Sequence, residues 1–168
     1  MGDDLLMKEV SKRTGTDQEN IFIRKMEIED LDQILPIAVS TPFNPWTRHM
    51  FLGEMANPFS HTFIMNKKES SVEFNSPVGF ICFRHIEEES ELLNLAIHSS
   101  MRHKGYGKKL MNFYLEFCNQ NGVKKYYLEV HPLNSPAIAL YVSCGFRVVG
   151  KRVKFYQGGY DALLMERQ

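Results

Sequence analysis

The second half of the chain alternates strand and helix patterns, and this alternation constrains the fold more than any other feature. Runs rich in Val, Leu, Ile and Tyr predict strands at residues 91–97, 124–131, 146–152 and 161–167. Apolar residues at helical spacing predict a long helix over residues 105–121. A shorter helix is expected from Ser135, its N-cap, and Pro136 to Gly145. This order of strands and helices implies α/β layering, with the helices packed on a sheet.

The first half supplies further strands and two more helices. Strands are predicted at residues 21–26, 61–66 and 78–84, and helices at residues 29–39 and 47–55. The acidic segment Glu87-Glu88-Glu89-Ser90 follows one of these strands, and it is predicted to be the solvated turn of a hairpin. Hairpins add antiparallel neighbours to an α/β unit, so the sheet is expected to be mixed.

The composition indicates one globular domain whose main partner is neither nucleic acid nor a membrane. The 168 residues carry 20 Lys and Arg against 20 Asp and Glu, so no net charge attracts phosphates or anionic lipids. Residues 1–20 are polar and are expected to form a flexible tail, and residues 21–168 to form the domain. The chain has no apolar run of membrane length, and its three widely spaced cysteines suit a reducing compartment, so a cytoplasmic location is expected.

A glycine-bearing loop before the long helix is the most informative segment for chemistry. A strand feeds the sequence Arg102-x-x-Gly105-x-Gly107, which opens the helix. The free N–H groups of a helix's first turn carry partial positive charge, and glycine lets the backbone approach a ligand. The loop therefore suits a pyrophosphate. Three lysines could add positive charge there: Lys104, Lys108 and Lys109.

The residues alone leave other interpretations of this loop open. It can be an ordinary helix start that needed flexible residues. A P-loop would require Ser or Thr where Lys109 stands, and a Rossmann loop would require a third Gly where Leu110 stands. The Rossmann interpretation is disfavoured rather than excluded, because an acidic residue, Glu129, does follow about twenty positions later.

The loop resembles the GNAT superfamily of N-acetyltransferases. Arg102-x-x-Gly105-x-Gly107 is similar to the acetyl-CoA pyrophosphate signature of that superfamily. The preceding Leu92-Leu-Asn-Leu-Ala-Ile97 is similar to the strand that leads into the signature. The resemblance implies that acetyl-CoA is the cosubstrate and that an amine is the acceptor.

Other segments resemble one branch of the superfamily, whose members acetylate protein N-termini, ribosomal proteins among them. These segments are residues 127–130, 134–146 and 156–165, together with Asn44-Pro45-Trp46. The resemblance covers roughly residues 21–168. It implies a GNAT-type single α/β domain, with a mixed, mostly antiparallel sheet of six or seven strands flanked by about four helices. A protein or peptide N-terminus is the implied acceptor.

The resemblance also implies roles for individual residues. Glu129 would be the general base, and Tyr141 the general acid that protonates the leaving thiolate. Trp46 and Tyr156 would shape the groove for the acceptor, although Trp46 has an equally weighted interpretation as a loop anchor packed on the core. The implied acetyl-CoA contacts are Leu95, Ala96 and Ile97, the pyrophosphate-binding residues Arg102, His103, Lys104, Gly105, Tyr106, Gly107 and Lys108, and Asn134.

The ordinary pKa values of the groups allow the acid and base roles of Tyr141 and Glu129 if their surroundings meet certain conditions. An α-amino group, with a pKa of about 8, loses its proton more readily than Lys. Glu129, whose ordinary pKa is about 4.3, needs burial or a water relay to act as base, and its simpler interpretation is an exposed strand residue. His131, on the same face, either tunes or replaces Glu129 or is an ordinary surface residue. Tyr141 lies on a helix stripe, where Tyr is usually core, yet phenol and thiol pKa values of about 10 and 8.5 are close.

Two other functions remain as alternatives. The acceptor could be a free small amine, such as a polyamine, an amino acid or an aminoglycoside, for which Glu87-Glu88-Glu89 is the only acidic attraction. The chain could also be a non-catalytic CoA-binding module, although the presence of both Glu129 and Tyr141 argues against that. The histidines and cysteines show no metal-ligand spacing, so no metal is expected. The sequence makes no prediction about the oligomeric state.

Overall fold

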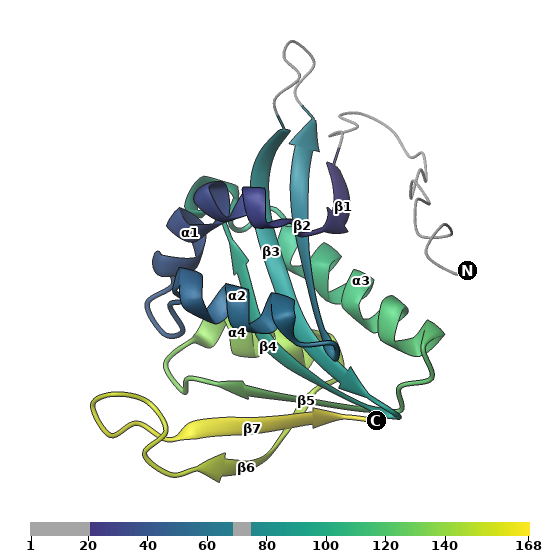
Figure 1. Cartoon of the computed structure of the whole chain (residues 1–168). Helices are drawn as coiled ribbons and strands as arrows, with labels where there is room; N and C mark the ends of the chain where they lie inside the picture. Colours follow the sequence, from purple (N-terminus) through teal and green to yellow (C-terminus); the bar gives the residue numbers. More distant parts are fainter. Residues whose placement is uncertain (1–20, 69–74) are drawn as a thin grey trace.

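The computed structural model describes residues 21–68 and 75–168, which form one sheet with helices on both sides (Figure 1). The strands are β1 (Ile21–Lys25), β2 (Ser60–Lys68), β3 (Asn75–Ile86), β4 (Glu89–Ile97), β5 (Lys125–Val130), β6 (Arg147–Arg152) and β7 (Ala162–Arg167). The helices are α1 (Leu31–Val39), α2 (Arg48–Ala56), α3 (Tyr106–Gln120) and α4 (Ser135–Ser143), with short 3-10 helices at Ile28–Asp30 and Ser99–Met101. The predicted tail, residues 1–20, lies outside the described residues.

The sheet has the strand order β1-β2-β3-β4-β5-β7-β6, and only β4 and β5 run parallel. Every other neighbouring pair is antiparallel. The long helix α3 connects β4 to β5, because a parallel pair needs a crossover of this kind. The structure therefore confirms a mixed, mostly antiparallel sheet, with seven strands and four α-helices among the described residues.

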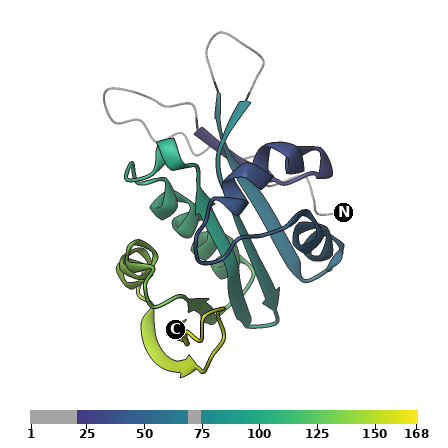
Figure 2. The same cartoon turned by 90° about the vertical axis from the view of Figure 1, so that its left-hand side faces the viewer.

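Two apolar cores lie on opposite faces of the sheet, and Figure 2 shows helices on both of these faces. Helices α1 and α2 cover one face, where Leu31, Ile34 and Phe51 are fully buried against Phe80 of β3. Helices α3 and α4 cover the other face, and their larger core includes Leu110. Successive strand residues face opposite cores, so neighbouring side chains of β5 lie in different surroundings. No helix in the described ranges is long and apolar enough to cross a bilayer.

Two local predictions are wrong by one or two residues, for reasons that depend on side-chain partners. The hairpin turn consists of Glu87 and Glu88 alone. Ser90 lies within β4, where its buried hydroxyl donates to the carbonyl of Arg84 and accepts from the Tyr114 hydroxyl. The N-cap of α4 is Asn134 instead of Ser135, because the Asn134 Oδ1 accepts the Ala137 N–H at 3.4 Å.

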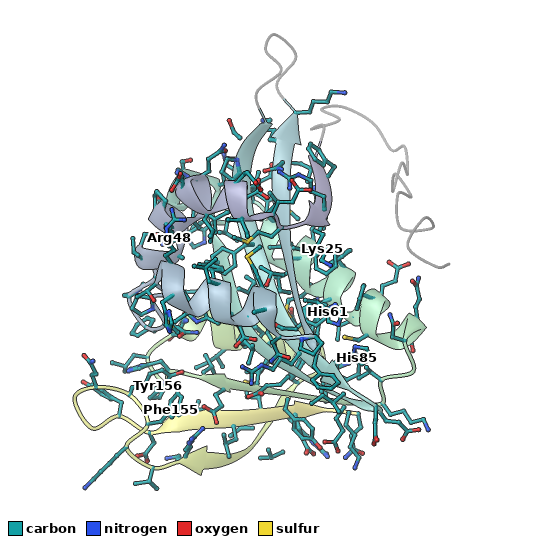
Figure 3. All side chains as sticks on the ribbon, viewed as in Figure 1. Lys25, Arg48, His61, His85, Phe155 and Tyr156 are labelled. Carbon is teal, nitrogen blue, oxygen red and sulfur yellow. The ribbon has the colours of Figure 1, made fainter. Side chains whose placement is uncertain are left out.

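A histidine pair occupies the end of the sheet next to β1. Nε2 of His61 on β2 lies 3.3 Å from Nδ1 of His85 on β3, and the His61 ring stacks on Phe83. Lys25, at the end of β1, belongs to the same group (Figure 3). Burial lowers the pKa of His61 to about 4, and the neighbouring His85 and Lys25 add to this effect. The folded chain therefore keeps the His61 imidazole neutral where a free imidazole is protonated.

Because of His61, stability is expected to fall as pH falls from about 6.5 towards 4. In this window the unfolded chain binds a proton at His61 that the folded chain does not bind. We expect the drop in Tm between pH 7 and pH 5 to be smaller in His61→Gln than in the wild type. His49→Gln, at an exposed position of α2, is the matched control and should keep the wild-type slope. Equal slopes in the wild type and His61→Gln would contradict the assignment.

Candidate active site

The parallel pair β4–β5 is joined only along its first half, and the two strands then separate (Figure 1). Pairing stops at Leu92 and Leu128, whereas β4 stays paired with β3 as far as Ile97. Leu93 is the extra residue of a β-bulge, because Phe83 faces Leu92 and the preceding β3 residue faces Asn94. A bulge bends its strand, so β4 turns away from β5 at this point. Within the described residues, the β5-facing edge of β4 beyond Leu92 has no strand partner.

The glycine loop follows β4 and leads into α3. His103 and Gly105 both have left-handed backbone conformations, with φ of 60° and 83°. The first helical hydrogen bond of α3 runs from Lys109 N to Gly105 O, so the preceding N–H groups of the turn have no intrahelical acceptor. A Cβ added to Gly105 would meet no heavy atom within 4 Å. The backbone of this turn is therefore open to an anionic ligand.

The basic side chains around the loop are mostly engaged elsewhere. The Lys108 ammonium donates to the carbonyl oxygen of Ser143 at 2.7 Å and to its Oγ at 3.0 Å, at the C-terminal end of α4. The Lys109 ammonium lies 5.1 Å from the centre of the Tyr106 ring. Arg102 Nε donates to the Ile97 carbonyl at 3.1 Å. Lys108 and Arg102 thus have hydrogen-bond partners within the protein, and Lys109 lies over the first residue of α3. The contribution of these charges to anion binding stays a prediction.

Glu129 lies on β5, one residue beyond the point where β4 separates. Its side chain is 22% exposed and accepts a hydrogen bond from Arg152 Nη1 of β6 at 3.0 Å. Burial raises the pKa of Tyr156 to about 12, and the negative charge of Glu129 adds to the rise. Glu129 is thus a partly buried, ion-paired carboxylate within electrostatic range of Tyr156, and the interpretation as an exposed strand residue is wrong.

Tyr141 approaches the same place from α4. It is buried, with its ring 6.2 Å from Phe146. Burial raises the pKa of the Tyr141 phenol, and the neighbouring Tyr156 and Cys144 raise it further. Tyr156 therefore lies within electrostatic range of both Glu129 and Tyr141. The catalytic roles of Glu129 and Tyr141 stay a prediction.

His131 is buried, with 6% of its surface exposed, so the interpretation as an ordinary surface residue is wrong. Three rings contact it: Phe43 from the α1–α2 loop, and Tyr156 and Tyr160 from the β6–β7 loop. Sequence reasoning missed Phe43, Tyr160 and the Arg152 partner of Glu129. The only signal for Phe43 was its place beside the Asn44-Pro45-Trp46 motif.

The α1–α2 loop is fastened to the point where β4 and β5 separate. Trp46 is buried with its ring 5.0 Å from that of Phe51, edge to face, so it anchors the loop in the core under α1 and α2. Asn44 Nδ2 donates to the carbonyl of the bulge residue Leu93, and Asn94 Nδ2 donates to the carbonyl of Asn44, both at 3.2 Å. This packing agrees with the interpretation of Trp46 as a loop anchor, and its effect on the acceptor stays a prediction.

Comparison with known proteins decides the family. The sequence model of the acetyltransferase (GNAT) family matches residues 28–146, which is more than half of the chain. The chain belongs to the GNAT family. A Bacillus subtilis relative, provisionally named ribosomal protein bS18-alanine N-acetyltransferase, is 29% identical to this GNAT enzyme over 145 residues, 85% of this chain and 92% of the relative.

Two solved structures share the fold of this GNAT enzyme. The ribosomal-protein-S18-alanine N-acetyltransferase of Escherichia coli superposes with a TM-score of 0.75 at 25% identity, covering 88% of this chain and 92% of that one. The NatC complex bound to Gag peptide and CoA matches with a TM-score of 0.75 at 20% identity, covering 88% of this chain and 98% of that one. The family match, together with the Bacillus subtilis relative and the Escherichia coli structure, makes the chain an N-acetyltransferase.

The loop and the β4 edge of this GNAT enzyme fit acetyl-CoA. Left-handed Gly105, with open surroundings, lets the first turn of α3 present N–H groups to a pyrophosphate. Along the unpaired edge of β4, the backbone groups of Leu95 and Ile97 face away from β3, whereas those of Ala96 face β3. The predicted contact of this strand with the pantetheine arm stays an expectation. Asn134, whose Oδ1 caps α4, keeps its predicted contact with that arm as an expectation. In the described residues, no three His, Cys, Asp or Glu side chains form a group that could hold a metal ion.

Gly105→Ala is expected to weaken acetyl-CoA binding by about tenfold. An L-residue at φ 83° costs about 1–2 kcal/mol of free energy of unfolding, and relief of that strain moves the N–H groups of the loop. Gly122→Ala is the matched control, because Gly122 has φ 80° and equally open surroundings at the other end of α3. Both variants should lose similar stability in thermal unfolding. Calorimetric titration with acetyl-CoA should separate them, and equal affinities would refute the proposed role of the loop.

Proposed function

We propose that this GNAT enzyme transfers the acetyl group of acetyl-CoA to the α-amino group of a protein N-terminus, by direct attack in a ternary complex. The observation that carries the proposal is the position of Glu129 on β5, directly beyond the last residue that pairs with β4, with Tyr156 in electrostatic range of both Glu129 and Tyr141. The activities named for the Bacillus subtilis relative and the Escherichia coli neighbour support a protein acceptor, with a ribosomal protein as the first candidate.

Glu129 accepts the proton that the amine must lose. An α-ammonium with a pKa of about 8 is partly deprotonated near neutral pH, so some acceptor molecules already carry a neutral amine. Glu129 takes the proton from the others. Arg152 orients the carboxylate, and the 22% exposure of the Glu129 side chain gives a relaying water access to it. Tyr156, beside this carboxylate, stays protonated and can donate a hydrogen bond to it or to the acceptor.

The thioester of acetyl-CoA develops negative charge during the reaction, first on its oxygen and then on the departing sulfur. The backbone N–H groups on the free edge of β4, those of Leu95 and Ile97, stabilise the thioester oxygen as it becomes an oxyanion. Tyr141 supplies the proton to the departing thiolate. Its raised pKa keeps the phenol protonated through the physiological range but widens the gap to a thiol. Hydrogen-bond donation from Tyr141 to the sulfur therefore precedes complete proton transfer.

Glu129→Gln is expected to lower kcat/KM by about 10²–10⁴-fold at pH 6.5, and by less at pH 9. The dependence on a base decreases as pH rises through the pKa of the acceptor ammonium, about 8, because free amine becomes abundant. The measurement is the pH profile of kcat/KM for the wild type and the variant. A ratio that stays constant with pH would remove Glu129 from the role of base.

The function is tested by following CoA thiol release with a panel of acceptors. The panel contains peptides that begin with different residues, and beside them free polyamines, amino acids and aminoglycosides. The proposal predicts that the peptides turn over with a higher kcat/KM than every free amine. Faster turnover of a small amine would assign the enzyme to small-molecule acetylation. No turnover together with tight acetyl-CoA binding would indicate a non-catalytic CoA-binding module.

A further inference from the structure

The ring of His131 lies where two loops from distant parts of the chain meet. Phe43 of the α1–α2 loop stacks on it with a centroid distance of 4.6 Å and an interplanar angle of 28°. Tyr156 and Tyr160 of the β6–β7 loop contact it at 4.7 Å and 4.8 Å. No direct ring contact between Phe43 and either tyrosine is found among the described residues, so the His131 ring is the bridge.

Further contacts connect the rings around His131 to Glu129 on one side and to the β4 bulge on the other. On one side, Tyr156 packs on Phe155 at 4.9 Å, and the guanidinium of Arg152 lies over the Phe155 ring at 4.6 Å (Figure 3). The same Arg152 donates to the carboxylate of Glu129. On the other side, the residue after Phe43 holds the carbonyl of Leu93 at the β4 bulge. A shift of the His131 ring would therefore displace groups on both sides of the proposed acceptor site.

The hydrogen bonding of His131 argues against a role as proton carrier. Its Nδ1 accepts the N–H of Leu133 at 3.1 Å, so the neutral ring carries its proton on Nε2. In that tautomer neither nitrogen offers a lone pair to a substrate proton. The ring is 6% exposed and is contacted by three other rings, which restricts exchange of its proton with water.

We propose that His131 is a positioning residue for the acceptor, whose ring holds the α1–α2 and β6–β7 loops in register beside Glu129. This inference rests on the proposed function, because it assigns those loops to the binding of the peptide N-terminus. It predicts that the ring sets the KM for the acceptor, whereas kcat and the KM for acetyl-CoA depend on it weakly.

Two substitutions distinguish the effect of the His131 ring from that of its hydrogen-bonding atom, Nδ1. His131→Asn removes the ring but keeps an acceptor at the position of Nδ1, because an Asn side chain bonds the N–H two residues on in the same way. His131→Phe keeps the ring and removes the acceptor. His49→Asn, at an exposed position of α2, controls for the loss of a histidine.

The test measures steady-state kinetics with the best peptide of the acceptor panel, after thermal unfolding has shown that each variant is folded. We expect His131→Asn to raise the peptide KM by about tenfold, with kcat, the acetyl-CoA KM and the pH profile unchanged. His131→Phe should return the peptide KM to within about twofold of the wild type, as should His49→Asn. A wild-type peptide KM in His131→Asn, or no rescue by Phe, would overturn the inference. A lower kcat with a shifted pH profile would make His131 a proton carrier and overturn it equally.

The proposed function and this inference fail in different ways. If the wild type acetylates no peptide but acetylates a small amine, the proposed acceptor is wrong. The same three variants are then measured with that amine. A tenfold rise in its KM for His131→Asn, reversed in His131→Phe, would uphold the positioning role without the peptide.

Discussion

Replacing Tyr141 by Phe is expected to reduce kcat by a factor of about 10²–10⁴ and to leave the dissociation constant of acetyl-CoA within about twofold of the wild type. The substitution removes only the hydroxyl. The ring that packs against Phe146 in the core under α3 and α4 remains. Turnover therefore reports on the proton and hydrogen bond that the phenol gives to the departing sulfur, whereas binding reports on the retained packing.

The control for this variant is Tyr127→Phe. Tyr127 lies on β5 two residues before Glu129, and its hydroxyl lies 3.5 Å from the Glu89 carboxylate at an exposed position. Its loss should change kcat by less than about twofold. Wild-type turnover in Tyr141→Phe would remove this residue from the role of acid. A Tm that falls far more than in Tyr127→Phe would show that the Tyr141 hydroxyl is structural.

Gly79→Ala is expected to lower the free energy of unfolding by about 1–3 kcal/mol or more and to weaken acetyl-CoA binding as well. Gly79 lies on β3 opposite Ile97. A Cβ there would come within 2.4 Å of the Ala96 carbonyl oxygen and 2.8 Å of Ile97 Cδ1. A backbone carbonyl cannot rotate away as a flexible side chain can, so β4 itself must shift. The displaced segment is the edge that we assign to the pantetheine arm.

Gly53→Ala is the matched control, because Gly53 lies within α2 and its added Cβ would meet no heavy atom within 4 Å. There the exchange should raise stability by up to about 1 kcal/mol, since Ala favours the helix. A change of 1 kcal/mol moves Tm by roughly 2–4 °C in a protein of this size, which thermal unfolding resolves. Unchanged acetyl-CoA affinity in a folded Gly79→Ala variant would separate this part of β4 from the binding site.

Local patterns in the sequence predict the elements of the fold to within a few residues. The helix expected over residues 105–121 is observed as Tyr106–Gln120, and the strand expected over 124–131 as Lys125–Val130. These signals work because apolar periodicity, caps and glycine stops act over one or two turns. The errors arise where a side chain distant in the sequence determines the local structure. Ser90, for example, joins β4 because its hydroxyl meets Tyr114, which is 24 residues away.

The site is predicted less completely, since much of it depends on long-range packing. Motifs single out Glu129 on β5 and Tyr141 on α4, but no local pattern reveals that Arg152 pairs with Glu129 across 23 residues. The β4 bulge at Leu93 likewise depends on the pairing with β3. The burial of His131 was missed for the same reason, because the rings that cover it come from two loops far away in the chain.

The neutral net charge of the chain agrees with a locally built anion site. We propose that the first turn of α3 supplies, through oriented backbone groups, the positive potential that an anionic cosubstrate requires on such a protein. The Lys108 ammonium donates to the Ser143 carbonyl, and the Lys109 ammonium lies over the Tyr106 ring at the start of α3. Positive charge spread over the surface is not needed for acetyl-CoA, which fits the absence of an excess of basic residues in the sequence.

The most direct test of the central claim is to locate the acetyl group by mass spectrometry on a peptide that carries both a free α-amine and an internal lysine. Two companion peptides isolate the sites, one blocked at the N-terminus and the other at the lysine. We predict acetylation of the α-amine in the unblocked and lysine-blocked peptides, with the N-terminally blocked peptide unmodified. Acetylation of the lysine, or equal labelling of all three peptides, would contradict N-terminal acetylation as the function.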